Sequence, residues 1–201
     1  MTSAIYITLF SYLLGCCTFG YYLVYCFTGQ DIRATGSGNV GSRNVGRLLG
    51  TKGFLLTLAG DAGKGALAVY LARHFSSEPW AGQLALLAAT CGHVWPLQLR
   101  FRGGKGFATL AGGLLLVQPV LLLTCLALCI LLYPVLKRTT KTALPVLACS
   151  PLISLLLARY GRITLGPGEL PLYTLLVVIV LFAHRSNIVS EFGPTDTKGD
   201  S

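Results

Sequence analysis

The chain has 201 residues, of which 53% are hydrophobic and 11% are charged, and its mean hydropathy is +0.67. This composition excludes an ordinary soluble domain. A net charge of +9 also occurs in nucleic-acid-binding proteins, but here the cations occupy short loops between apolar runs. We therefore expect anionic lipid headgroups and anionic substrates as partners, and no nucleic acid.

The apolar runs predict helices that cross a membrane, because a helical span takes about 20 residues. The N-terminal run lacks the positive residues that begin a secretory signal, so it is expected to remain as a span. We predict an all-α polytopic membrane domain over residues 1–189, followed by a polar tail over residues 190–201. The runs lie at residues 1–28 and near 54–75, 80–99, 107–136, 143–158 and 170–183.

The main groups of cations predict the orientation of these spans. They fall at residues 33–52, 100–105, 137–141 and around Arg185, and the positive-inside rule places all four groups in the cytoplasm. This arrangement needs an external N-terminus and two crossings within the run near 107–136, where Gln118-Pro119 marks a turn. We therefore predict about seven transmembrane helices, rather than six, with the active face in the cytoplasm.

Three clusters of glycine and cations lie at the ends of apolar runs, at residues 35–44, 61–65 and 101–106. Glycine lets backbone N–H groups approach an anion closely, and a nearby Lys or Arg neutralises its charge, so each cluster is a candidate phosphate loop. None is a Walker loop, because Leu58 and Leu99 stand where its first glycine belongs and a glycine follows each lysine. Nucleotide hydrolysis is therefore disfavoured.

Two charged residues lie within or beside an apolar helix. Asp61 and Lys64 are three residues apart and can form an ion pair on one face. Two interpretations stay open: mutual neutralisation, which lets a polar turn enter the membrane, and a functional site. Lys105 also has two interpretations, as a positive-inside anchor or as a ligand-binding residue. The glycines around Lys105 favour the second, because an anchor needs no bare backbone.

The histidines and cysteines differ in what they indicate. His184 leads the polar cluster 184–187 at the end of the last apolar run, which favours a functional role, whereas His93 is expected in helix packing or hydrogen bonding. The seven cysteines lie mostly in apolar runs without metal-ligand spacing, and Cys125 and Cys129 share a helix face with no acidic or His residue nearby. We predict packing for the cysteines, and no metal and no cofactor.

Taken in order, the motifs resemble those of the integral-membrane acyl-phosphate:glycerol-3-phosphate acyltransferases called PlsY. The resemblance extends over nearly the whole chain. It rests on five segments: residues 32–47, 61–65, 92–96, 101–109 and 184–188.

The resemblance implies a seven-helix fold in the bacterial cytoplasmic (inner) membrane and a reaction of phospholipid biosynthesis. An acyl group would move from acyl phosphate to the 1-hydroxyl of glycerol 3-phosphate, giving lysophosphatidic acid and phosphate. Because acyl phosphate is already activated, an enzyme of this family would mainly align two phosphorylated substrates. The resemblance also implies that the hydroxyl proton would pass to a phosphate oxygen of the donor. A soluble enzyme that forms acyl phosphate is a further candidate partner.

Site residues follow from the motif matches and the glycine loops. The expected catalytic residues are Ser37, Lys105, His184 and Asn187, with His184 orienting a substrate rather than abstracting a proton. The expected phosphate-binding residues are Gly36, Gly38, Asn39, Gly41, Asn44, Arg47, Lys64, Gly103 and Gly104.

The chain departs from the family pattern at a few positions. Arg43 stands where the family has Thr, Leu144 where it has Ser, and Ser190-Glu191 where it has Arg-Leu. Two other functions therefore stay open: a phosphate-ester transporter and a divergent, non-catalytic paralogue. Transporters favour midplane sites and internal repeats, whereas most of the marked residues here cluster at one predicted face.

Overall fold

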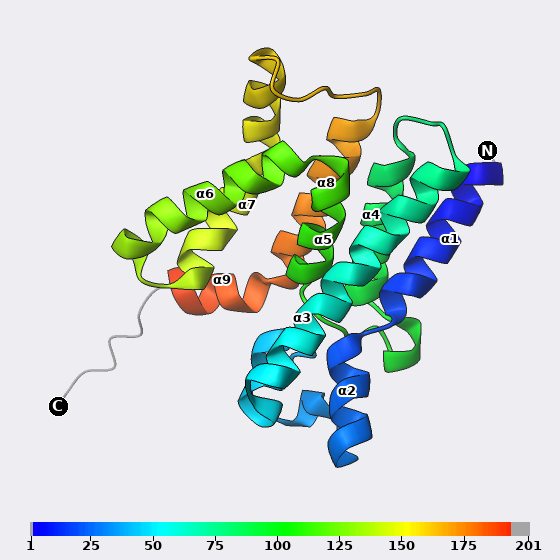
Figure 1. The fold of residues 1–201 in the computed structure, drawn as a ribbon. Helices are drawn as coiled ribbons and strands as arrows, with labels where there is room; N and C mark the ends of the chain where they lie inside the picture. The colour runs from blue at the N-terminus through cyan, green and yellow to red at the C-terminus, as the bar shows by residue number, and fades with distance from the viewer. Residues whose placement is uncertain (1, 194–201) are drawn as a thin grey trace.

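A computed structural model describes residues 2–193, and this part of the chain folds into helices without a β-strand (Figure 1). Two short 3-10 turns, Ile32–Ala34 and Leu97–Leu99, lie in the loops. The α-helices are α1 (Thr2–Cys16), α2 (Phe19–Thr28), α3 (Ser42–Phe75), α4 (Ala81–Val94), α5 (Phe107–Val117), α6 (Pro119–Leu136), α7 (Thr139–Arg159), α8 (Glu169–Ala183) and α9 (Arg185–Phe192).

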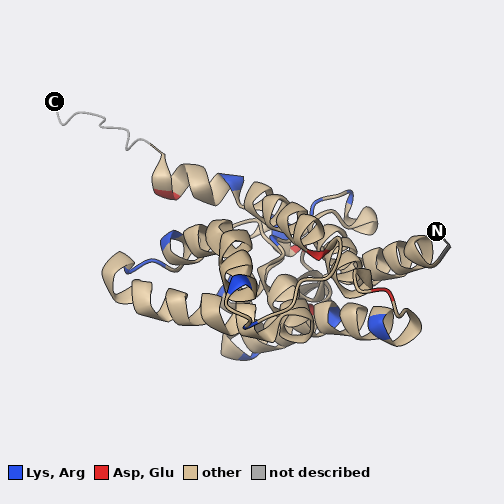
Figure 2. Ribbon diagram, turned by 90° about the horizontal axis from the view of Figure 1, so that it is seen from above, with Lys and Arg blue, Asp and Glu red and all other residues tan. Residues whose placement is uncertain are grey.

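The predicted membrane architecture is confirmed in its main feature, an all-helical fold with several long apolar helices. Four segments have the length and composition to cross a membrane: residues 3–28, α3, α6 and α7. A fifth arises if α8 and α9, which are bent by 63° at His184, form one broken span. Figure 2 shows how few charged residues the helices carry.

The long run near 107–136 is divided as predicted. The helix breaks at Gln118, and Pro119 begins α6, since proline has no N–H to continue the ladder of α5 but fits the first turn of a helix. Figure 1 shows the chain turning sharply between α5 and α6.

The helix that contains the second apolar run begins earlier than the run itself. Helix α3 starts at Ser42, ahead of the apolar residues near 54, and contains a kink at Gly50, where φ is 68°. Only glycine adopts this conformation without strain. The turns of α3 before this kink carry Asn44 and Arg47 and continue directly from the glycine cluster at residues 35–44.

Helix α4 lies at the centre of the bundle. Twelve of its fourteen residues are buried, and it packs against α1, α3, α5 and α8.

Glycines permit close packing between α3 and α5. A Cβ on Gly65 of α3 would overlap the backbone carbonyl of Thr109 on α5, and one on Gly112 of α5 would overlap that of Ala62 on α3. Small residues at helix contacts are typical of membrane bundles, where packing replaces the hydrophobic effect.

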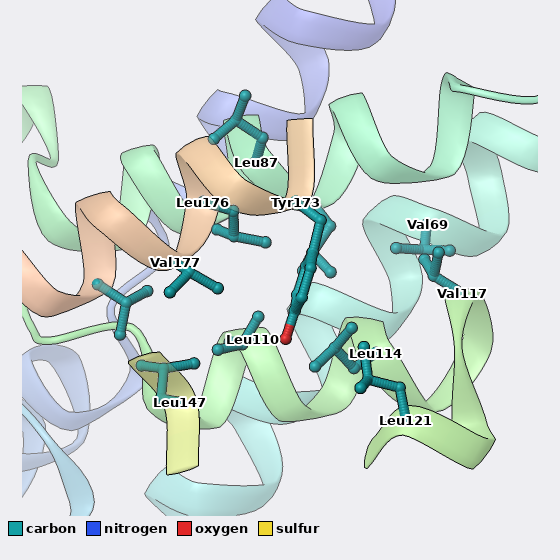
Figure 3. Packing of buried hydrophobic residues seen from close by; sticks show 12 residues of the cluster. Val69, Leu87, Leu110, Leu114, Val117, Leu121, Leu147, Tyr173, Leu176 and Val177 are labelled. Atoms are coloured by element: carbon teal, nitrogen blue, oxygen red, sulfur yellow. The ribbon is translucent and has the colours of Figure 1, made fainter. Parts of the chain in front are cut away.

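The outer helices present apolar side chains to their surroundings. Only 6% of α6 is buried, and Ile130, Leu131 and Val135 are each more than 70% exposed. Such a surface is stable in lipid but not in water. On the inner side, α5, α7 and α8 enclose a cluster of buried residues around Tyr173 (Figure 3). The chain is thus a multi-pass membrane protein. Of the predicted tail, residues 190–192 continue α9, and residues 194–201 lie outside the described part.

The close contact between α3 and α5 gives a first prediction. Gly65→Ala is expected to lower the free energy of unfolding by about 2 kcal/mol, because the added methyl group meets backbone that cannot move freely. Gly63→Ala is the matched control: its Cβ would enter open space, and alanine favours the helix by up to about 1 kcal/mol. Thermal unfolding in detergent measures both. Equal melting temperatures for the two variants would contradict this packing.

Candidate active site

A cavity of about 680 Å³ brings the predicted motifs together. In Figure 1 the loops that precede α3 and α5 and follow α8 lie toward the lower end of the bundle, away from the N-terminus. The predicted site residues that line the cavity are Ser37, Asn39, Gly41, Asn44, Arg47, Lys105, His184 and Asn187.

The first glycine loop is shaped by a single amide. Asn44 is buried, its Oδ1 accepts a hydrogen bond from the N–H of Ser37 (3.0 Å), and its Nδ2 donates to the carbonyls of Thr35 and Asn39 (3.0 Å each). Gly36 and Gly38 take positive φ values, 56° and 70°, which glycine adopts readily. These glycines do not line the cavity, so their contribution is the turn that presents Ser37.

The first turns of α3 supply two guanidinium groups. Arg43 and Arg47 are exposed side chains that line the cavity. Within residues 2–193 neither makes a salt bridge. Both are therefore free to bind an anion, and arginine suits phosphate because its fork of N–H groups matches two oxygens at once.

The glycine cluster at residues 101–106, called the lysine loop below because it carries Lys105, packs against the end of α4. The N–H of Gly103 donates to the carbonyl of Val94 (3.1 Å) and the N–H of Gly104 to that of His93 (3.0 Å). A Cβ on Gly103 would overlap the His93 carbonyl, and one on Gly104 would overlap the His93 ring. Glycine is thus required here for close packing, and these two N–H groups are already bonded within the protein rather than turned to the cavity.

Lys105 reaches the cavity from this loop and meets the polar cluster after α8. Its Nζ donates to Oδ1 of Asn187. The pKa of Lys105 is lowered by burial and, to a smaller degree, by the positive charge of Arg185. His184 is buried beside them, and its Nδ1 lies 2.8 Å from the carbonyl of Val180. Because a carbonyl only accepts, Nδ1 carries the proton and Nε2 remains as the acceptor.

Lys64 lies in a buried cluster with Asp61 and His93. Its Nζ lies 2.8 Å from Oδ1 of Asp61, 2.8 Å from Nδ1 of His93 and 2.9 Å from the carbonyl of Cys17. The Lys64 and Asp61 side chains are 1% and 3% exposed. An ammonium has three protons to donate, and all three are used. Asp61 and His93 line the cavity but Lys64 does not, so mutual neutralisation is the interpretation that the geometry favours.

The departures from the family pattern meet at this cavity. Arg43, Leu144, Ser190 and Glu191 all line it. Glu191 forms an ion pair with Arg138 (2.8 Å) at the turn between α6 and α7. The departures therefore alter the wall of the site rather than distant parts of the bundle.

Sequence reasoning missed some of the lining residues. His93 was expected in packing, although the Gly-His-x-x-Pro segment that contains it was part of the resemblance and gave a signal. Lys137 and Arg138 were interpreted only as orientation signals. Phe107 and Tyr133 had no signal, because they stand in apolar runs and only the fold brings them to the cavity.

These features define a polytopic α-helical membrane protein with a cationic site at one end of its bundle. Comparison with known proteins identifies its family. A family model described as glycerol-3-phosphate acyltransferase matches residues 5–192. The chain belongs to this family, and the resemblance drawn from the motifs is confirmed.

Individual relatives carry the same family name. The chain is 41% identical to glycerol-3-phosphate acyltransferase 1 of Desulfitobacterium hafniense (strain Y51), over 92% of this chain and 88% of the relative. It is 35% identical to the glycerol-3-phosphate acyltransferase of Clostridioides difficile (strain 630), over 98% and 95%. A crystal structure of PlsY, an integral membrane glycerol 3-phosphate acyltransferase in its glycerol 3-phosphate form, superposes with a TM-score of 0.79 at 30% identity, covering 92% of this chain and 90% of that chain.

The buried cluster gives a second prediction. Lys64→Met leaves the Asp61 carboxylate buried without its cation, so we expect a loss of about 3–5 kcal/mol in unfolding free energy. The double variant Asp61→Leu/Lys64→Met removes both charges and is expected to recover most of that loss. Glu191→Gln, which breaks the partly exposed pair with Arg138, should cost less than about 1 kcal/mol. Unfolding in detergent compares the three; a Lys64→Met cost as small as that of Glu191→Gln would contradict the buried pair.

Proposed function

We propose that this chain is a glycerol-3-phosphate 1-O-acyltransferase of phospholipid synthesis whose acyl donor is acyl phosphate. The observation that carries the proposed acyl transfer is the junction of a cationic cavity with an apolar groove. The groove has a volume of about 470 Å³, and no charged residue among residues 2–193 lines it. It shares Phe107, Tyr133, Thr139 and Ala143 with the cavity. A molecule with an anionic head and an alkyl chain fits both.

The charges of the cavity suit two phosphorylated substrates. Arg43, Arg47, Lys105 and Lys137 line it, and within residues 2–193 none of the four forms a salt bridge. The carboxylate of Asp61 is already neutralised by Lys64. The excess positive charge would offset the mutual repulsion of acyl phosphate and glycerol 3-phosphate, and fixed cations cost no reorganisation during the reaction.

The reaction needs little further chemistry from the protein. In the proposed route the 1-hydroxyl oxygen attacks the carbonyl carbon, the bond from that carbon to the phosphate oxygen breaks, and the hydroxyl proton passes to a phosphate oxygen. Lys105 and Arg47 would hold phosphate oxygens, with Asn187 orienting Lys105. Ser37 would donate a hydrogen bond, and Nε2 of His184 would accept one from an acceptor hydroxyl. Alignment of this kind contributes a large share of the rate.

Other predicted residues would act on the loops that carry these groups. Asn39 and Gly41 line the cavity in the first loop, where we propose that they contact phosphate. Asn44 would hold that loop in place. Gly103 and Gly104 would let the lysine loop pack closely on α4. Lys64 would hold α3 and α4 together through Asp61 and His93.

We further propose seven crossings, an external N-terminus and a cytoplasmic site in the bacterial inner membrane. The helices from α3 to α8 run alternately up and down in Figure 1. Residues 3–28, which contain α1 and α2, have the length and composition of one further span and would make the seventh crossing. Helices α4 and α5 are only 14 and 11 residues long, but α4 is enclosed by other helices. A site at one end of the bundle argues against a transporter, whose site would lie near the midplane.

The proposed function is tested by phosphate release from palmitoyl phosphate in the presence of glycerol 3-phosphate, with purified protein in detergent. We expect release that requires both substrates and produces lysophosphatidic acid. Lys105→Ala should lower kcat/KM on the order of 100-fold, and Lys52→Ala, an exposed cation outside the cavity, should change it little. Activity with acyl-CoA but not palmitoyl phosphate would overturn the donor; release without glycerol 3-phosphate would indicate another acceptor.

The environment of Lys105 gives a pH prediction. Because its pKa is lowered, Lys105 loses its charge at a lower pH than an exposed lysine does as the pH rises. The KM of at least one phosphate substrate should therefore increase at alkaline pH. Lys105→Arg keeps its charge throughout and should shift that increase to higher pH, whatever its absolute activity. Steady-state kinetics across the alkaline range measure this; superimposable KM profiles would contradict the role of Lys105.

A further inference from the structure

The apolar groove has a defined length. Its lining residues recur every three or four positions along α6 and α7, as one face of each helix requires. On α7 they extend from Thr139, beside the cavity, to Ser150, and on α6 from Tyr133 to Leu122. Either stretch rises about 16 Å at the helical 1.5 Å per residue. This is about half of the roughly 30 Å hydrocarbon core of a bilayer, so the groove has the depth of one leaflet.

A hydrogen-bonded pair closes the far end of the groove. The hydroxyl of Tyr173, on α8, lies 2.7 Å from Oγ of Ser150, and Ser150 in turn donates to the carbonyl of Leu147 (2.7 Å). Tyr173 therefore donates to Ser150, and both hydroxyls are satisfied in apolar surroundings. The two residues are 3% and 0% exposed. This bond adds to the packing of the buried cluster, which holds the Tyr173 ring in place.

The ring stands in front of a packed core. Figure 3 shows Tyr173 reaching from α8 toward Leu110 and Leu114 of α5, which both line the groove. Beyond the groove, Leu121 and Leu176 belong to the same buried cluster but do not line it. A chain that enters from the cavity thus meets the aromatic ring before it could reach Leu121 or Leu176.

We propose that Tyr173, held by Ser150, is the end wall that sets the longest acyl chain this enzyme accepts. The inference rests on the proposed function, because the occupant is the alkyl chain of the acyl donor. The continuity of the groove with the cavity identifies that occupant: the phosphate head would lie among the cations, and the chain would follow the groove toward the ring. Because the chain would otherwise lie in lipid that is equally apolar, the selection comes from the steric limit rather than from burial.

The test is the ratio of kcat/KM for stearoyl phosphate to that for lauroyl phosphate. Tyr173→Ala lengthens the groove and should raise this ratio on the order of tenfold, the lower end of what pocket size contributes to selectivity. Val146→Phe, which fills the groove partway along α7, should lower it by a similar factor. Tyr173→Phe keeps the ring and should retain a ratio close to that of the wild type.

The matched control is Leu176→Ala. Leu176 lies one turn after Tyr173 on α8, is fully buried in the same cluster, and does not line the groove. It should lower stability as Tyr173→Ala does, without changing the ratio. An unchanged ratio in folded Tyr173→Ala and Val146→Phe would overturn the end wall, and so would an equal shift in Leu176→Ala.

A binding measurement separates this inference from the choice of donor. Thermal stabilisation by lysophosphatidic acids of increasing chain length requires no turnover. A chain-length limit that Tyr173→Ala extends would support the end wall even if acyl phosphate proved not to be the donor. A limit that is absent in the wild type would overturn the end wall even if acyl phosphate were turned over.

Discussion

The buried cluster of Lys64, Asp61 and His93 is the interaction on which the site depends. It joins three parts of the bundle: the break between α1 and α2 through the carbonyl of Cys17, helix α3, and the end of α4. Charged groups in apolar surroundings are tolerated only when they are paired and hydrogen-bonded. The cluster therefore favours one arrangement of these helices. It also positions the lysine loop, because Gly103 and Gly104 pack directly on His93.

From that fixed point the site is assembled by loops that bring charge to the end of an apolar bundle. Asn44 holds the first glycine loop, and the end of α4 holds the lysine loop. Asn187, in the polar cluster after α8, accepts a hydrogen bond from Lys105. The apolar groove opens into the same space. A water-soluble phosphate ester and a lipid chain must meet at the boundary of water and membrane, and the structure provides a polar cavity and an apolar groove at their junction.

The departures of this chain from the family pattern belong to the same space. Arg43 adds a cation to the first turn of α3, Leu144 replaces a hydroxyl by a buried apolar side chain, and Glu191 pairs with Arg138. The residues expected to hold phosphate, Arg47 and Lys105, remain beside them. The changes thus alter the surroundings of the proposed phosphate sites while these two cations are kept.

The sequence by itself determined the membrane character, the break at Gln118-Pro119 and the family, and it pointed to many of the residues that line the cavity. Composition, proline chemistry and motif spacing are local properties, which is why the sequence shows them. It did not determine the early start of α3 or its kink at Gly50, where φ is positive, or which groups Lys64 contacts. The tertiary structure decided that the Lys64 ammonium bonds to Asp61, His93 and the Cys17 carbonyl, that Phe107 and Tyr133 line the cavity, and that Tyr173 lines the apolar groove. Those residues lie far apart in the chain, and only the packing of helices against one another brings them together.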